Sequence, residues 1–383
     1  MTNYAYRASV LALFLALPLA ACGPGAGEGT AVGPDGQPLP QVSQEESQAP
    51  SLSGSACAAL SSLPTEEGDL SKRLAKASIL GASTTKFSEP GSAQLRSFEH
   101  AFGQLLRQVD PAAVEELRTL GFEVSRFRTA GGASWLIVEE RAPRTGGGTF
   151  AINLAPARNL WLETPHADSD EGTLAQGAAQ VVSLGARALL ITGANRCASD
   201  TTTACETGKT AVCGGRLRTS DAAHFADNYF TAAHRALRSA YPSAVAVSLH
   251  GMETQGAEAA VVSDGTRDMN PGSLSLRLRD AVNRHLGAGD VRAFSCNDKT
   301  DDGKFRPLCG STNVQGRIDN GASDACTSSG GAAQNRFLHV EQGPDLRMGW
   351  GFDPVAQGLA DTVPCSLSGS GLDCPAAVAP ACT

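Results

Sequence analysis

The sequence lacks several features by which common classes of protein are recognised. It has no basic stripe, and its formal net charge is −8 over 383 residues. A nucleic-acid-binding protein needs lysine and arginine to neutralise phosphates, so the composition argues against nucleic acid as a partner. No Gly-x-Ser-x-Gly motif occurs, which argues against a serine hydrolase of the α/β type. The function is therefore sought outside these two classes.

Cysteine spacing excludes a further kind of site. There are eleven cysteines, but no two have the C-x-x-C spacing of a zinc ribbon. Ten remain once Cys22 is set aside, and an even number in an exported protein predicts a disulfide framework of five bridges. The sequence leaves the pairing open. The ten are Cys57, Cys197, Cys205, Cys213, Cys296, Cys309, Cys326, Cys365, Cys374 and Cys382.

The N-terminal segment predicts export. Arg7 precedes an apolar run, 10–17, that is too short to span a bilayer comfortably. The run leads into the tetrapeptide L-A-A-C, which ends at Cys22 and resembles the lipobox of bacterial lipoproteins, where the chain is cut before a cysteine that then carries the lipid. An ordinary signal peptide is the alternative. We expect residues 1–22 to be a lipoprotein signal peptide, with Cys22 lipidated and the protein held at the cell envelope by a lipid anchor only.

Beyond Cys22 the chain divides into a linker and one domain. Residues 23–56 are rich in glycine, proline, serine and glutamine. They cannot bury enough apolar surface to offset their ordering entropy, so they are predicted to form a flexible tether. No second hydrophobic stretch is long enough to cross a bilayer. Residues 57–383 suffice for one large α/β domain, in which 57–150 supplies helices and the first strands; a large domain with a small N-terminal partner is the alternative.

Strand and helix patterns alternate from residue 159 onward. Apolar runs predict strands at 159–165, 186–194, 244–251 and 336–342. Helical periodicity predicts helices at 172–184, 220–239 and 274–286, the second capped by Ser220 and Asp221. The alternation predicts a three-layer α/β/α architecture with a mixed, largely parallel sheet. The cysteine-bearing segments 195–219 and 297–335 are predicted to be disulfide-crosslinked loops that shape a binding site.

Chemically competent side chains follow three of the predicted strands. His166 comes after the first, with Asp168, Asp170 and Glu171 close behind it; His250 ends another, and Glu341 lies in the last. In such sheets, functional groups gather at the carboxyl ends of the strands. A catalytic zinc ion takes three protein ligands and leaves a fourth position for water, and two histidines with one carboxylate meet that need.

These motifs resemble those of poly-γ-glutamate hydrolases, which belong to the broader zinc carboxypeptidase-like fold. The match consists of His166-x4-Glu171, a Ser-x-His-Gly strand end at His250, and Glu341 on a late strand. The resemblance implies a zinc hydrolase-like domain in which His166, Glu171 and His250 hold Zn²⁺ and Glu341 is the catalytic base. The first spacing is longer than the H-x-x-E of zinc carboxypeptidases, so Asp170 is the alternative to Glu171, and Asp168 ranks behind both.

The resemblance also indicates how substrate is bound. In zinc carboxypeptidases, an Asn-Arg pair between the metal motifs binds the substrate's carboxylate, which implies that Asn195 and Arg196 are substrate-binding residues. Other candidates have weaker support. Asp221 and His224 are expected in the first turn of a helix, with lining of the cleft as the alternative, and His339 is expected on the same sheet face as Glu341. The positions expected on helix surfaces are His100, His234 and His285.

The resulting prediction is a zinc-dependent amide or peptide hydrolase, of carboxypeptidase or γ-glutamyl hydrolase type, tethered to the cell envelope. Its expected substrate is a peptide or a γ-glutamyl chain. Two alternatives stay open from the sequence. One is a binding lipoprotein of the same fold without catalysis, and the other is a zinc amidase for small N-acyl amino acids.

Overall fold

The computed structural model describes residues 54–205, 210–253, 258–289, 291–298, 308–348, 353–365 and 374. All of these belong to one compact unit, Val42–Thr383. The predicted signal peptide, Cys22 and most of the predicted tether lie outside the described residues. Residues 54–56, the end of that tether, instead begin helix α2 (Gly54–Ser62). Among the described helices, none has the length and apolar character needed to span a bilayer.

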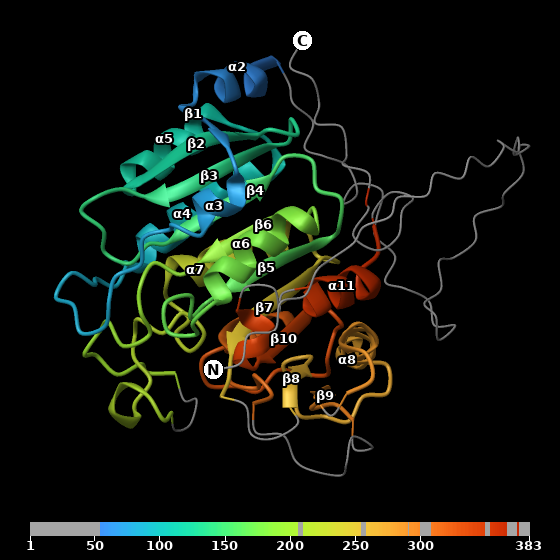
Figure 1. Ribbon diagram of the computed structural model, residues 1–383. Helices are drawn as coiled ribbons and strands as arrows, with labels where there is room; N and C mark the ends of the chain where they lie inside the picture. Colours follow the sequence, from blue (N-terminus) through green and yellow to red (C-terminus); the bar gives the residue numbers. More distant parts are fainter. Residues whose placement is uncertain are drawn as a thin grey trace, which may run out of the picture. The chain divides into compact units, whose positions relative to one another are not determined.

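The described residues form a ten-stranded sheet with the order β1-β2-β3-β4-β6-β5-β7-β10-β8-β9 (Figure 1). The strands are β1 (Thr65–Gly68), β2 (Phe122–Thr129), β3 (Ser134–Glu140), β4 (Thr149–Asn153), β5 (Leu160–Thr164), β6 (Ala188–Ile191), β7 (Val245–Gly251), β8 (Glu258–Ser263), β9 (Arg292–Ser295) and β10 (Phe337–Gln342). Five of the nine ladders are parallel, including the run β6-β5-β7-β10. The other four are antiparallel. The predicted α/β class and mixed, largely parallel sheet are confirmed.

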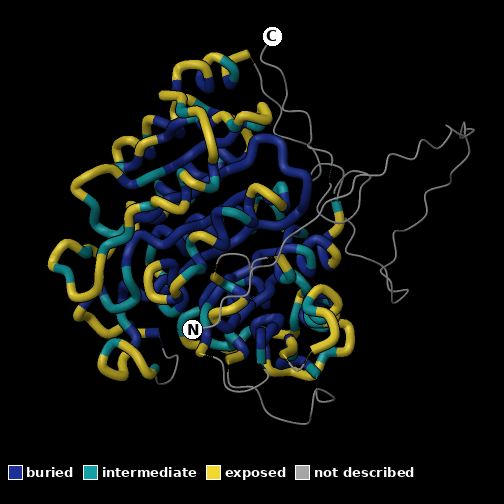
Figure 2. The backbone as a smooth tube through the Cα atoms, viewed as in Figure 1, coloured by how far each residue is buried: buried dark blue, intermediate teal, exposed yellow. Residues whose placement is uncertain are grey.

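Helices cover both faces of the sheet. One hydrophobic core packs α2, α4 (Ser92–Arg107), α5 (Pro111–Thr119) and α7 (Tyr229–Ala240) against one face. A second core packs α3 (Leu70–Leu74), α6 (Thr173–Ser183), α8 (Leu274–Leu286) and α11 (Asp353–Thr362) against the other. Short helices α9 (Val314–Asp319) and α10 (Pro344–Arg347) and the 3₁₀ turn η1 (Cys213–Gly215) lie in the connections. Central strands are therefore buried on both faces, as Figure 2 shows, which explains their continuous apolar sequences.

Four disulfides join described cysteines. They are Cys197–Cys213, Cys205–Cys326, Cys296–Cys309 and Cys365–Cys374. Cys57 is also disulfide-bonded, and Cys382 lies outside the described residues. The bridge between Cys205 and Cys326 joins the two long loops to each other. Such a framework indicates an oxidising compartment, as expected for an exported protein.

The structure corrects the predicted helix 220–239. Helix α7 begins only at Tyr229, where the side chain of Asn228 accepts a hydrogen bond from the backbone of Thr231. Residues 220–228 form turns instead, and Asp221 is 1% exposed rather than at a solvent-facing cap. The reason is that its carboxylate has buried partners in the site described below.

Candidate metal centre

Three adjacent parallel strands carry the candidate site. The first is β5, and His166 lies in the turn that follows it; β7 contains His250, and β10 contains Glu341. In the register between β7 and β10, Glu341 is the direct partner of His250. The three side chains are at most 8% exposed. Since parallel strands end at one edge of a sheet, residues 175 positions apart in the sequence meet here.

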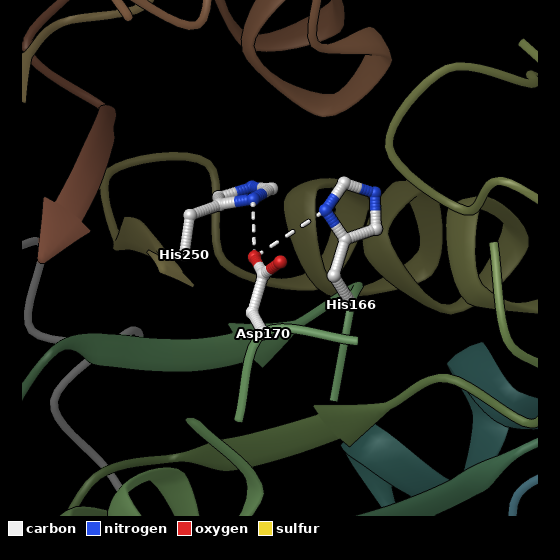
Figure 3. A group of neighbouring side chains, drawn as sticks. All are labelled: His166, Asp170 and His250. Carbon is white, nitrogen blue, oxygen red and sulfur yellow. Dashed lines mark ion pairs between the residues drawn. The ribbon is translucent and has the colours of Figure 1, made fainter. Parts of the chain in front are cut away.

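The acidic side chain placed between the two imidazoles is Asp170 (Figure 3). Its Oδ2 lies 3.4 Å from Nδ1 of His166 and 3.3 Å from Nδ1 of His250. The backbone amide of Gly251 donates to the same oxygen at 3.0 Å. One ligand atom from each of His166, Asp170 and His250 lies within 4.8 Å of the others, a group that can hold a metal ion. Burial alone would raise the pKa of Asp170, but the neighbouring imidazoles of His166 and His250 hold it well below its usual value.

The two other acids of this segment lie elsewhere. The side chain of Glu171 is exposed, and only its backbone carbonyl is engaged, by Arg347. Asp168 is exposed and accepts a hydrogen bond from Asn195. The cause is local: the carbonyl of His166 accepts from the amide of Asp170 at 2.8 Å, so the chain makes a single turn that returns the fourth following residue to His166. Asp170 therefore replaces Glu171, the first choice from the sequence, in the candidate ligand set.

The orientation of His166 matches that of a metal ligand. Its Nε2 lies 2.8 Å from Oδ1 of Asp221, whose pKa is well below its usual value because the charges of His224 and His166, with their hydrogen bonds, outweigh burial. Its Nδ1 is buried and, apart from the 3.4 Å ion-pair contact with Asp170, has no hydrogen-bond partner among the described residues. A metal-binding imidazole commonly donates its second N–H to a carboxylate, which fixes the ring and directs the other nitrogen at the ion. The residues present therefore fit a metal ion at Nδ1.

Two further groups of possible ligands adjoin this one. One is the group of His166, Asp221 and His224, in which Oδ1 of Asp221 also lies 3.1 Å from Nδ1 of His224 and accepts from the amide of Ala223. The group of His250, His339 and Glu341 borders the central set on its other side. We take the central group as the candidate metal site, because in it both histidines direct Nδ1 at the same carboxylate.

Glu341 is buried beside this group. Its Oε1 lies 3.7 Å from Nε2 of His339, whose ring centroid is 4.5 Å from that of His250. Burial, together with the negative charge of Asp170, raises the pKa of Glu341 to about 8. Burial lowers the pKa of His250 to about 4, a direction that favours the neutral imidazole needed for metal ligation. For His166, burial and the charge of Arg196 act to lower the pKa, but the charges of Asp221 and Asp170 outweigh them and raise it.

The predicted substrate-binding pair is separated by the structure. The guanidinium of Arg196 reaches the site: its Nε is 3.4 Å from Asp221 and its Nη1 is 4.0 Å from Asp170. Asn195 instead donates to Asp168 at 2.8 Å and does not line the cleft around the metal group. That cleft has a volume of about 800 Å³ and contains both histidines, Asp170 and Glu341. Its size suits a small or extended organic substrate.

Sequence reasoning gave too small a role to three residues. Asp221 and His224 were expected at a helix start, although their Asp-x-x-His spacing was a visible signal. His339 lies where its alternation with Glu341 indicates, on the same face of β10. No pattern in the sequence pointed to Arg347, whose three hydrogen bonds reach backbone carbonyls from separate segments.

Comparisons with protein-family models, curated proteins and solved structures gave no significant match. The chemistry of the site is therefore argued from its own side chains. What the geometry establishes is a buried cluster of histidine, aspartate and glutamate, at the carboxyl end of a parallel sheet, that can hold a metal ion.

Proposed function

We propose that this protein is an exported zinc-dependent hydrolase of amide or peptide bonds. The observation that carries the proposal is the pair of buried imidazoles directed at one carboxylate, with a second, buried carboxylate in the same cleft. Two nitrogen ligands and one oxygen ligand are a usual protein contribution to catalytic zinc. The ligands would be His166, Asp170 and His250, which is the set implied by the resemblance to poly-γ-glutamate hydrolases with Asp170 in place of Glu171.

When bound, zinc supplies Lewis acidity, which polarises a carbonyl group and lowers the pKa of water to about 7. The role of Glu341 is to take a proton from the attacking water and return it to the nitrogen of the leaving amine. A group that both accepts and donates a proton needs a pKa near the working pH. Burial of Glu341 moves its pKa upward in that direction. Asp221 holds the ring of His166 in place through Nε2.

The proposed substrates are peptides or γ-glutamyl chains, and the proposed location is the cell envelope, through a lipid on Cys22. The disulfides support an exported protein. A cleft lined by histidine, arginine and acidic side chains supports a substrate with several hydrogen-bonding groups.

The test compares metal content and turnover in matched variants. The chain from residue 23 onward is purified, its metals are measured by elemental analysis, and hydrolysis is assayed on γ-glutamyl peptides, α-linked peptides and N-acyl amino acids. We expect about one zinc ion per chain, and loss of activity of about 100-fold or more in Glu341→Gln with zinc retained, since a general acid–base typically contributes 10²–10⁴-fold. Glu171→Gln is the control, because its side chain is exposed and outside the site.

Each result discriminates between the candidates. Zinc with turnover of N-acyl amino acids alone would favour the small-molecule amidase. Zinc without turnover of any substrate would favour a binding lipoprotein. A wild-type chain without metal, even after incubation with zinc, would rule out the proposed function.

A further inference from the structure

Arg347 connects the three chain segments that carry the candidate metal centre. Its Nε donates to the carbonyl of Glu171 at 2.8 Å. Its Nη1 donates to the carbonyls of Met252 at 3.0 Å and Gln342 at 2.7 Å. In the sequence, these carbonyls follow Asp170, His250 and Glu341, respectively, by one or two positions. The guanidinium is therefore held in a fixed place relative to the site.

Glycine makes this placement possible. A Cβ atom at Gly251 would lie 2.6 Å from Nε of Arg347, closer than a side chain tolerates. A Cβ atom at Gly172 would overlap the backbone carbonyl of Arg347, and Gly172 has a φ of +92°, which disfavours other residues. The two glycines that follow the metal-ligand motifs thus leave the space that the arginine occupies.

Arg347 forms no ion pair with a carboxylate within the described part of the chain, although its charge acts to lower the pKa of Glu341 in the same cleft. Its hydrogen bonds within the described chain all go to neutral carbonyls, and its Nη2 has no partner among the described residues. Arg347 nevertheless lines the cleft. Glu253, which lines the same cleft, is exposed and forms no ion pair with it in the described chain. Arg196 differs, because it forms ion pairs with Asp221 at 3.4 Å and Asp170 at 4.0 Å.

We propose that Arg347, rather than Arg196, binds a carboxylate of the substrate. The inference rests on the proposed function and narrows its substrate class: the hydrolysed amide lies close to a free carboxylate, as in the last bond of a peptide or in a γ-linked glutamyl residue. A guanidinium fixed by three carbonyls needs little further ordering to form a charge-assisted hydrogen bond. Its remaining N–H groups supply the donors.

The test measures binding in zinc-free protein, so that coordination to metal does not contribute. The probes are N-acetyl-L-glutamate and its uncharged diamide, and their dissociation constants are measured by calorimetry. We expect the wild type to bind the dicarboxylate at least tenfold more tightly than the diamide. Arg347→Gln should lose this preference, Arg347→Lys should keep part of it, and Arg196→Gln should retain it. An unchanged preference in Arg347→Gln, or its loss in Arg196→Gln alone, overturns the proposal.

A second measurement covers the case in which Arg347→Gln does not fold. Butanedione modifies accessible arginines, and the modified positions in the wild type are mapped by peptide mass spectrometry with and without N-acetyl-L-glutamate. Protection of Arg347 supports the proposal, and protection of Arg196 without Arg347 contradicts it. These outcomes are independent of the proposed function, whose failure would appear as absence of zinc and of amide hydrolysis with the carboxylate preference intact.

Discussion

Asp170 and Glu171 are neighbours in the chain, but their side chains have opposite surroundings. Asp170 is 7% exposed and contacts both imidazoles, whereas Glu171 is exposed. We expect Asp170→Asn to lose zinc, because it replaces an anionic ligand by a neutral amide. Glu171→Gln should retain about one zinc ion per chain. Elemental analysis after dialysis measures the difference, and equal zinc in both variants would contradict the assignment of Asp170.

Asp221 contacts the ligand His166 and is not in the central ligand set itself. We expect Asp221→Asn to weaken zinc binding about 10- to 100-fold, the usual effect of removing the carboxylate behind a metal-bound imidazole. Competition with a chromogenic chelator gives the dissociation constant. Thr312→Val is the control, since Thr312 contacts only Nε2 of His224 at the edge of the same network. Affinity equal to wild type in Asp221→Asn would show that His166 needs no such support.

From the sequence, only those site residues could be predicted that lie at the ends of recognisable strands. His166, His250 and Glu341 follow or end strongly apolar strands, so their convergence at one edge of the sheet was foreseeable. The choice of Asp170 depends on one turn of backbone after β5, which spacing alone does not specify. Asp221 comes from a segment that folds against the site through tertiary contacts, and such contacts leave no periodic pattern in the sequence.

The strands and helices show a similar division. The apolar strands β5 and β7 and helix α8 were predicted to within one residue at each end, because their burial produces a continuous or periodic apolar pattern. Strand β6 was predicted over 186–194 but spans only Ala188–Ile191. The four-residue strand β1 has the sequence TEEG and is largely exposed, so it carries no such pattern. β1 pairs with β2 through backbone hydrogen bonds. The side-chain pattern of the sequence does not indicate this pairing.

Helix α7 and strand β5 are joined by a buried charge network that contradicts one prediction. His234, expected on the surface, is 0% exposed. Its Nδ1 lies 2.6 Å from Glu163 and its Nε2 lies 3.1 Å from Asp319. Arg238 forms a further ion pair with Asp319 at 2.7 Å. The helical periodicity correctly predicted that His234 lies in a helix. A polar residue such as His234 is nevertheless expected on the surface of a helix when the sequence does not show which buried groups it pairs with.

This network should make folding stability depend on pH. Burial alone would lower the pKa of His234, but the charges of Asp319 and Glu163 raise it to about 9 from an ordinary value of 6.5. A pKa that is raised in the folded state contributes stability below pH 6.5, and this stability is lost as pH rises through 9. The pKa difference between the folded and unfolded states corresponds to about 3 kcal/mol of unfolding free energy. We expect the free energy of unfolding to fall between pH 6.5 and 9.5, as measured by urea denaturation.

The matched variant for this prediction is His234→Gln, which removes the titrating group. It should be less stable at pH 6.5, because two buried carboxylates lose a cationic partner. Its free energy of unfolding should also fall less steeply with pH than that of the wild type. Parallel profiles for the two proteins would show that another group is responsible. His285→Gln is the control, since His285 is an exposed histidine on a helix.

The two long loops around the cleft are held by the disulfide between Cys205 and Cys326, which closes a sequence separation of 121 residues. We expect the double variant Cys205→Ser, Cys326→Ser to lose about 3–5 kcal/mol of unfolding free energy, the usual range for a bridge that closes a long loop. Denaturant titration measures the loss. The comparison is the double variant Cys296→Ser, Cys309→Ser. These two cysteines are only 13 residues apart, so removing their bridge should cost less unfolding free energy. An equal or larger loss there would contradict the loop-length argument.

Strand β10 lies between β7 and β8, which follow each other in the chain but do not pair. Until residues 337–342 arrive, each of those two strands has an unpaired edge in the interior of the sheet. The same six residues carry Glu341. A chain in which this gap persists therefore lacks the proposed catalytic base, and a fragment ending before residue 337 would expose unpaired strand edges that favour aggregation. Closing the sheet is also what places Glu341 beside His250.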